Sequence, residues 1–450
     1  MSSVPLYEKQ KLMRDFSTDH KRVLNFSDAG TGKTAATLHA IANLKAKALV
    51  MAPKAIIEPS WVDDCRTFTP ALTIMPAYAA NRSLAFEVGP DIVVTNHDAA
   101  VWLRDNPKYL DQFDLLVMDE STAYKNPTSN RSKAMAYVKD KFERRIALTG
   151  TPMSNGLKHI WHQAYLIDDG ERLGDSYYRF LNSTHSKKRV TRTVDTWIEK
   201  DGMREAVATL LSDITVRFTL DECQDIPPQT IRTKQIELPA SVRKVYKQMA
   251  GRYYAELNDT TIIAANAAVM TNKLLQIASG GLYDNMGDAE WIASEASERT
   301  RNDLIAELCA ERACSLVVFN WAHQKEALIR AFNRVGITAI GIIDGKNSRY
   351  TPQTVRDAQA GKLQVVLVHP QSGSHGLTLT RAKTTIWASP IYNAEFFQQL
   401  NRRTRRTGQT EETEVICIQA KDTIEAGIYE LIKERVDHET TLLELLRSML

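Results

Sequence analysis

The stretch from Arg22 to Ala40, RVLNFSDAGTGKTAATLHA, decides the fold class. An apolar run leads into a turn containing Gly30 and Gly32, followed by Lys33, Thr34 and a series of good helix formers. Glycines let the backbone curl so that several N–H groups face a phosphate, while a lysine reaches the β and γ phosphates and a hydroxyl binds Mg²⁺. The stretch therefore predicts a buried strand, a phosphate-binding loop and a helix, which together open an α/β domain.

The loop runs from Ser27 to Thr34 and departs from the usual pattern in one place, because its first position is Ser27 where glycine is typical. The strand, the two glycines and the helix are nevertheless in register. The loop therefore predicts binding of ATP with Mg²⁺, and Thr34 is the expected metal ligand. The predicted nucleotide contacts in the loop are Asp28, Gly30, Thr31, Gly32, Lys33 and Thr34.

Short apolar runs that end in polar or small residues recur along the chain. Five lie in the first half, at 22–26, 48–51, 92–94, 115–118 and 146–148, and five in the second, at 316–319, 337–343, 365–368, 385–388 and 415–418. Helical stretches separate them, as in parallel sheets covered by helices on both faces. The sequence therefore predicts an α/β protein with two parallel-sheet domains in tandem.

The domain boundary is expected at Ile226-Pro227-Pro228, because two prolines cannot continue a helix or an interior strand. The predicted domains are residues 1–225 and 226–450. Helical periodicity with few strand signals, at about 157–220 and about 239–300, indicates a helical insertion in each domain.

Composition places the chain among ordinary globular proteins, with 450 residues, 43% hydrophobic and 25% charged. No apolar run is as long as a membrane span, and the amino terminus lacks the pattern of a signal peptide, so a soluble, cytoplasmic protein is expected. Five cysteines without a CxxC pair favour reduced thiols over a disulfide framework or a zinc site. The net charge of +3 means that a nucleic-acid partner must be argued from local clusters.

Two adjacent carboxylates, Asp119 and Glu120, follow the apolar run at 115–118. By themselves they could simply begin a solvated loop, because acidic residues are common after strands. A nucleotide held through Mg²⁺, however, needs a carboxylate near the metal and a group that orients the attacking water. Together with the phosphate loop, the pair predicts a catalytic site made of Lys33, Asp119 and Glu120.

Four arginines, Arg402, Arg403, Arg405 and Arg406, lie within five positions after a helical stretch. Such a cluster can be a solvated basic face or an electrostatic contact with nucleic acid. Arginines three positions apart also share one helix face and can reach a γ phosphate together, as arginine fingers do. The cluster alone leaves these alternatives open.

Taken together and in this order, the motifs resemble the superfamily-two helicases, and specifically the Swi/Snf-like branch of double-stranded DNA translocases. The resemblance covers nearly the whole chain. In the first half it rests on Leu6 to Gln10, Ser27 to Thr34, Met51 to Lys54 with Trp61, Val94 to Asn96, Asp119-Glu120 with Lys125-Asn126, and Leu148 to Pro152 with Asn155. In the second half it rests on Val317 to Asn320, Asp344 to Lys346, Ser372-Gly373 with Gly376 to Thr380, Gln399 to Gln409, and Thr423 to Glu425.

The resemblance implies two RecA-like domains with ATP between them. It implies that Gln10 reads adenine, that Gly373 and Gln399 are further nucleotide contacts, and that Arg403 and Arg406 are the arginine fingers. Asp119 with Thr34 would hold Mg²⁺, and Glu120 would orient the attacking water. The candidate contacts to the DNA backbone are Lys54, Thr95, Asn320, Lys346 and Thr378.

Two departures from the family pattern concern communication between motifs. Ser121-Thr122 stands where the family usually has Ala-His after the carboxylates, and Arg405 stands where a histidine is usual. Thr122 is shorter than an imidazole and cannot carry its charge. The departures therefore bear on how the carboxylate motif communicates with the Leu148 to Pro152 motif and with the arginines.

The expected function is that of an ATP-dependent DNA translocase or helicase acting on duplex, forked or four-way-junction DNA. Fork remodelling or branch migration in replication, recombination or repair is the expected role, because compact phage and bacterial members of this branch are the nearest resemblance. Three alternatives remain: a protein–DNA remodelling subunit that needs a partner, an RNA helicase, and a nucleotide-dependent DNA-binding module with little turnover.

Smaller signals have simpler interpretations. His159 and His162 share a helix face, but without a third ligand they do not predict a metal site. The basic run Lys187 to Arg189 with Arg192 is read as a solvated face, and Trp61 and Trp321 as core residues.

Overall fold

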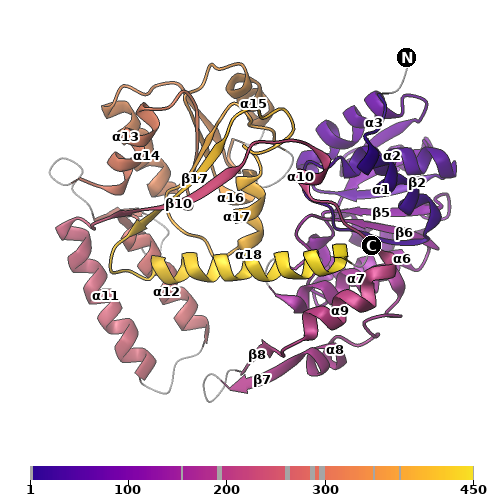
Figure 1. Cartoon of the computed structure of the whole chain (residues 1–450), viewed down its shortest axis with the longest axis horizontal. Helices are drawn as coiled ribbons and strands as arrows, with labels where there is room; N and C mark the ends of the chain where they lie inside the picture. Colours follow the sequence, from indigo (N-terminus) through magenta and orange to yellow (C-terminus); the bar gives the residue numbers. More distant parts are fainter. Residues whose placement is uncertain are drawn as a thin grey trace. The chain divides into compact units, whose positions relative to one another are not determined.

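The computed structural model describes residues 4–153, 156–189, 195–258, 264–283, 289–292, 299–347, 350–373 and 377–448, and Figure 1 labels many of their helices and strands. The chain divides into two compact units. The first comprises Met1–Ser186, Trp197–Asp225 and Arg435–Leu450, and the second comprises Lys187–Thr196 and Ile226–Glu434. The chain passes into the second unit between Asp225 and Ile226, directly before the two prolines.

A seven-stranded sheet, counted within the described residues, forms the centre of the first unit. Its strand order is β3-β4-β2-β5-β6-β1-β9, and every paired neighbour is parallel. The strands are β1 (Arg22–Asn25), β2 (Ala48–Ala52), β3 (Ile74–Ala77), β4 (Ile92–Asn96), β5 (Leu115–Asp119), β6 (Arg144–Leu148) and β9 (Thr215–Val216). All five apolar runs predicted for this half are therefore strands of one sheet.

Both faces of this sheet are buried, because alternate residues of each strand enter two different cores. In β2, Leu49 and Met51 pack into one core with Phe86 and Trp161, while Val50 packs into the other. The covering helices are α1 (Glu8–Asp19), α2 (Lys33–Leu44), α3 (Asp63–Phe68), α4 (Arg82–Glu87), α5 (Ala99–Asp105), α6 (Asn130–Lys139) and α7 (Ile160–Asp168).

The predicted insertion at 157–220 is partly helical. It contains α7, α8 (Tyr177–Thr184) and α9 (Met203–Leu211), and the short α10 (Leu220–Cys223) ends it. It also contains a two-stranded sheet of β7 (His185–Arg189) and β8 (Asp195–Glu199), which the sequence analysis did not predict. Residues 186–189 of β7 are exposed and polar, so no apolar alternation signalled this strand.

The second unit is built around a six-stranded parallel sheet, again counted within the described residues, with the order β10-β17-β16-β13-β15-β14. Its strands are β10 (Gln229–Ile236), β13 (Ser315–Val318), β14 (Ile340–Ile343), β15 (Val365–Val368), β16 (Thr384–Trp387) and β17 (Thr413–Ala420). Its helices are α13 (Arg301–Ala310), α14 (Ala322–Arg334), α15 (Thr351–Gln359), α16 (Pro370–Gly373) and α17 (Ala394–Asn401). The prediction of two parallel-sheet α/β domains is confirmed.

The second predicted insertion contains α11 (Ala240–Asn258) and α12 (Ala264–Ala278), which share an apolar cluster around Val242, Tyr246 and Leu274. A small antiparallel pair, β11 (Gly281–Tyr283) and β12 (Ala289–Trp291), follows the helices. None of the helices among the described residues has the length and apolar character needed to cross a membrane.

The last helix, α18 (Glu425–Ser448), belongs to both units. Its residues up to Glu434 group with the second unit, whereas those from Arg435 onward group with the first. Leu442, Leu443 and Leu446 are buried in a core of the first unit, which accounts for this division. The predicted second domain, 226–450, therefore differs from the observed unit at its carboxyl end.

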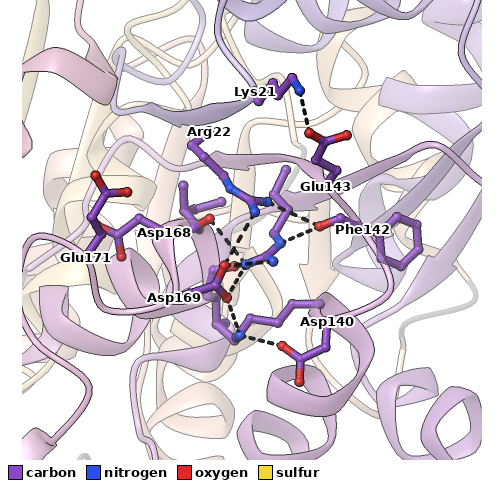
Figure 2. A network of polar contacts seen from close by, with 12 residues as sticks. Lys21, Arg22, Asp140, Phe142, Glu143, Asp168, Asp169 and Glu171 are labelled. Atoms are coloured by element: carbon purple, nitrogen blue, oxygen red, sulfur yellow. Dashed lines mark hydrogen bonds and ion pairs between the residues drawn. The ribbon is translucent and has the colours of Figure 1, made fainter.

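A polar network around Asp169 fastens the amino ends of β1 and β6 (Figure 2). Asp169 caps α7 with a φ of 61°, and its carboxylate accepts hydrogen bonds from Arg145 at 2.7 and 3.0 Å and from Lys139 at 2.5 Å. Arg145 and Lys139 are each only 3% exposed. Burial by itself would raise the pKa of Asp169, but the bonds from Arg145 and Lys139 outweigh it and hold this pKa at about 2.

The variant Asp169→Asn tests this network, because asparagine accepts the left-handed backbone while it removes the charge and one of the two acceptor oxygens. The folded pKa is below the unfolded value of about 3.9, so the charge stabilises the fold above pH 4 and this contribution disappears toward pH 2. Solvent reaches half of the carboxylate, so we expect a loss of about 1–2 kcal/mol at pH 6. Urea unfolding at several pH values measures it, and a loss that stayed constant down to pH 3 would contradict the assignment.

Candidate active site

The phosphate loop joins β1 to α2 with two glycines in the left-handed region. Gly30 has a φ of 90° and Gly32 a φ of 83°, a conformation that L side chains rarely adopt. A Cβ on Gly32 would also lie 2.0 Å from Nε2 of Gln10, so only glycine fits here. The loop ends at the first turn of α2, whose leading N–H groups have no partner within the helix and favour an anion.

Gln10 lies against this loop, and its role as the adenine-reading residue stays a prediction. Its side chain is 6% exposed, accepts a hydrogen bond from the Tyr7 N–H at 3.0 Å and donates to the Thr31 carbonyl at 3.5 Å. The amide is therefore held beside the loop from α1.

The two residues that precede the glycines are fixed by the segment around β9. The Ser27 hydroxyl accepts a hydrogen bond from the Phe218 N–H at 3.0 Å, which gives the serine at this position a structural role. Asp28 forms an ion pair with Arg217 at 2.9 Å and accepts a bond from the Leu220 N–H at 3.1 Å. The Asp28 side chain thus holds the loop in shape, and its contact with the nucleotide stays a prediction.

Lys33 folds back over the loop. Its amine donates to the carbonyls of Ser27 at 2.7 Å and Asp28 at 2.9 Å, which places a positive charge at the mouth of the phosphate loop. Thr34 is the next residue of α2 and is partly exposed, so its hydroxyl is accessible to a metal ion. Thr31 turns inward instead, where its hydroxyl donates to the Asp28 carbonyl at 2.8 Å.

The carboxylate pair lies at the carboxyl end of β5, on the same edge of the sheet as the phosphate loop. Asp119 is 7% exposed, and burial together with the neighbouring Glu120 raises its pKa well above the usual range. Its Oδ2 accepts a hydrogen bond at 2.8 Å from the indole N–H of Trp61. Glu120 has a φ of 53°, and its Oε2 accepts a bond from the Thr149 hydroxyl at 3.2 Å.

Trp61 is a core residue, as predicted, and its indole also contacts the carboxylate pair. It is fully buried, in a π-helical segment, Ile57–Val62, that follows β2. Such segments are frequent at functional sites because they redirect a side chain. Here the indole N–H fixes one oxygen of Asp119.

The arginine cluster of the second unit is partly buried and bonded to backbone carbonyls. Arg403 is 4% exposed and donates to the carbonyls of Gln399 at 3.0 Å and Leu377 at 3.4 Å, while Arg406 donates to Leu377 at 3.0 Å. Arg405 donates to the Pro227 carbonyl at 2.9 Å, so the residue that replaces the usual histidine holds the chain where it enters the second unit.

Two further predicted nucleotide contacts lie in this unit. Gln399 is 3% exposed, and its Oε1 is buried without a hydrogen-bond partner among the described residues, as a group awaiting a ligand would be. Gly373 is required for packing, because a Cβ there would lie 2.1 Å from a Val368 methyl carbon. Asn155 and Gly376, which formed part of the resemblance, lie outside the described residues.

The five predicted DNA contacts differ in accessibility. Lys54 and Lys346 are exposed and Thr378 is partly exposed. Thr95 is fully buried and its hydroxyl donates to the Ala77 carbonyl at 2.7 Å, so its side chain cannot reach a DNA backbone in this fold. The Asn320 amide donates to Ser389 and Pro390 at 2.9 and 3.0 Å and is engaged within the second unit.

His162 lies on α7 and is buried, whereas His159 ends the 3₁₀ turn Leu157–His159 directly before this helix and is half-buried. His162 Nδ1 lies 2.6 Å from the Tyr124 carbonyl, and burial lowers the pKa of His162 to about 4 and that of His159 to about 3. Within the described residues no group of three His, Cys, Asp or Glu side chains is arranged to hold a metal ion.

Comparison with known proteins decides the family. The SNF2-related domain model matches residues 11–280, which is more than half of the chain. The chain belongs to the SNF2-related family. The resemblance to the Swi/Snf-like branch of superfamily-two helicases is therefore confirmed, and the chain carries the ATP-dependent helicase core of this family.

Relatives of this SNF2-related chain occur in phages and in cells. It is 29% identical over 463 residues to protein p41 of Acyrthosiphon pisum secondary endosymbiont phage 1, covering 97% of this chain and 96% of that protein. It is 22% identical to the ATP-dependent helicase FUN30 of Saccharomyces cerevisiae and to the ATP-dependent DNA helicase DDM1 of Arabidopsis thaliana, of which it spans only 44% and 56%. Among solved structures, the SWI2/SNF2 ATPase core of Sulfolobus solfataricus in complex with dsDNA has a TM-score of 0.43 at 20% identity, covering 98% of this chain and 94% of that one.

The residues of this SNF2-related core fit Mg-ATP. Two left-handed glycines and a helix amino end form the cradle, and Lys33 supplies a positive charge at its mouth. Thr34 and Asp119 offer the hydroxyl and carboxylate oxygens that Mg²⁺ prefers. The metal would orient the phosphates and neutralise their charge when bound.

The variant Trp61→Phe tests whether the indole positions Asp119 for the metal. Phenylalanine keeps a ring in the core but removes the N–H donor, so we expect the affinity for Mg-ADP to fall about tenfold. The affinity for ADP in the presence of EDTA should be unchanged. Calorimetric titration measures both.

Trp161→Phe is the matched control, because it removes a buried indole bond to the Gly174 carbonyl in the same unit. It should leave both affinities unaltered. Equal weakening of ADP binding with and without the metal in Trp61→Phe would assign the indole to packing alone.

Proposed function

We propose that this SNF2-related core hydrolyses ATP in response to DNA and uses the energy to move along duplex or branched DNA. The observation that carries the proposal is the convergence, at one edge of a parallel sheet, of the phosphate loop with Lys33 and of the carboxylates Asp119 and Glu120. Membership of a family with ATP-dependent helicases supports it.

The proposed division of labour follows from the positions of the side chains. Lys33 neutralises the β and γ phosphates, and Thr34 with Asp119 holds Mg²⁺. Glu120 orients the attacking water and accepts its proton. The Thr149 hydroxyl donates to Oε2 of Glu120 and so holds this carboxylate in place. Arg403 and Arg406 stabilise charge on the transferred phosphoryl group after exchanging their bonds to the Leu377 carbonyl for bonds to phosphate.

We propose fork remodelling or branch migration at four-way junctions, in replication, recombination or repair, as the biological role. Membership of the SNF2-related family supports a DNA motor, and the similarity to phage protein p41 extends over nearly the whole of both chains. Branch migration also suits a motor that separates strands weakly, because the base pairs broken ahead are remade behind. The proposed location is the cytoplasm, or the cytoplasm of the host if a phage encodes the protein.

ATP hydrolysis tests the motor directly. Turnover is measured without nucleic acid and with single-stranded DNA, linear duplex, a four-way junction and RNA, and Glu120→Gln is the control. We expect duplex or junction DNA to stimulate turnover more than RNA does. Glu120→Gln should lose about 100-fold or more in turnover while still binding nucleotide, because the amide cannot accept the proton of the water.

The pattern of stimulation separates the alternatives. No stimulation by any nucleic acid would contradict an autonomous motor and favour a subunit that needs a partner or a module that binds DNA with little turnover. Stimulation by RNA above that by DNA would favour an RNA helicase. Stimulation by junctions above linear duplex would support the branch-migration role.

The exposed lysine Lys54 is the sharpest test of the DNA contacts. A phosphate contact carries no sequence information, so Lys54→Ala should weaken binding to all duplexes alike. It should also reduce the slope of log K against log salt concentration by about 1. Fluorescence anisotropy at several salt concentrations measures both quantities.

Thr95→Val is the matched control for this experiment, because the Thr95 hydroxyl is buried and bonded to the Ala77 carbonyl. It should lower thermal stability slightly and leave DNA affinity and its salt dependence unchanged. A loss of affinity in Thr95→Val as large as that in Lys54→Ala would contradict the distinction between Lys54 as a DNA contact and Thr95 as a buried residue.

A further inference from the structure

Ser121, the first departure from the family pattern after the carboxylates, has a specific partner in this fold. Its hydroxyl donates a hydrogen bond of 2.7 Å to Oε1 of Gln163 on α7. Ser121 is 1% exposed and Gln163 is fully buried. Two apolar side chains would pack together without a directional bond, whereas this polar pair is joined by one.

Gln163 connects this serine to the loop that follows β6. Its amide donates to the Pro152 carbonyl at 2.6 Å and to the His159 carbonyl at 3.0 Å. The side-chain oxygen accepts one bond and both N–H groups donate, so the amide has a single satisfied orientation. We call the chain Ser121–Gln163–Pro152 the glutamine link.

The same loop is also bonded to the catalytic carboxylate itself. The Thr149 hydroxyl donates to Glu120 and in turn accepts the Thr151 N–H at 3.2 Å. Glu120 and Ser121 are neighbours, so the two ends of the loop, Thr149 and Pro152, are both tied to this one point of the chain. The loop cannot shift without changing a bond to Glu120 or to the glutamine link.

On its far side the loop is bonded to the last helix. The N–H of Met153 donates to Oε1 of Glu439 at 2.9 Å, and Glu439 is 1% exposed. Glu439 belongs to α18, the helix whose earlier residues, up to Glu434, group with the second unit. The loop is therefore bonded both to the catalytic end of β5 and to an element that the two units share.

We propose that Gln163 is a positioning residue that makes ATP hydrolysis responsive to DNA, by holding the Thr149 to Pro152 loop in register with Glu120 through the glutamine link. This inference rests on the proposed function. It also answers how the carboxylate motif communicates with the loop when Ser121-Thr122 replaces the usual Ala-His. A fully satisfied buried polar link fixes one arrangement, and breaking either end leaves a buried group without its partner.

The test is a double-mutant cycle of Ser121→Ala, Gln163→Leu and the double variant. For each protein, ATP turnover is measured with and without saturating duplex DNA, and the ratio of the two rates is the DNA stimulation. Nucleotide affinity, DNA affinity and the midpoint of thermal unfolding are measured alongside. Thr184→Val is the matched control, because it removes a buried hydroxyl of the first unit that bonds to the Phe180 carbonyl within α8 and to Nδ1 of His185.

We expect DNA stimulation to fall about three- to tenfold in each single variant, a range typical of residues that carry coupling between sites. The double variant should lose no more DNA stimulation than Gln163→Leu alone, because Gln163→Leu already breaks the glutamine link. The double variant should unfold at a higher temperature than Gln163→Leu, because it no longer buries an unpaired Ser121 hydroxyl. Nucleotide and DNA affinities should stay within twofold of the wild type. Thr184→Val should lower the unfolding midpoint without lowering the stimulation.

Four results would overturn the inference. Single variants that lower only the unfolding midpoint, as Thr184→Val does, would assign the link to stability. A double variant whose loss of stimulation is the product of the two single losses would show that Ser121 and Gln163 act separately. A wild-type protein without DNA stimulation would overturn the proposed function and this inference together. A wild type that DNA stimulates, with variants that DNA stimulates equally, would overturn the inference alone.

Discussion

The parallel register of three neighbouring strands sets the geometry on which the site depends. Leu148 of β6 pairs with Asp119 of β5 on one side and with Asn25 of β1 on the other. The phosphate loop, the loop after β6 and the carboxylate pair therefore leave the sheet at one edge. Because both faces are buried, a slip of one residue would exchange the two sets of core side chains, so packing enforces the register.

Buried donors then orient the groups that the register brings together. Arg217 holds Asp28, Trp61 holds Asp119 and Thr149 holds Glu120, each by a hydrogen bond from a side chain outside the phosphate loop. In a poorly hydrated interior such bonds are stronger than in water, and a carboxylate that is already oriented needs little rearrangement on binding. The catalytic groups are thus held by a supporting layer whose members have no chemical role of their own.

The extent to which sequence predicts this structure depends on distance along the chain. The ten apolar runs form strands of the two sheets because strands buried on both faces are uniformly apolar. The edge strands β3, β9 and β10 were missed: β3 contains Pro76, β9 has two residues, and β10 is mostly exposed. The phosphate loop and the carboxylates are local patterns, whereas Trp61, Arg217 and Gln163 act on partners 58, 189 and 42 residues away, which no local pattern reveals. Motif position also predicts a DNA contact for Thr95, although its side chain is buried and bonded to the Ala77 carbonyl.

The division of α18 between the units has a consequence for how the protein is made. Residues Leu442, Leu443 and Leu446 complete a core whose other members come almost entirely from the first half of the chain. Domains usually fold in order as they leave the ribosome. Here the first unit leaves the ribosome with an apolar face uncovered and must wait for the last helix to be synthesised, so the nucleotide-binding half cannot reach its final packing before the rest of the chain exists. Removal of these three leucines would leave that face of the first unit open to water.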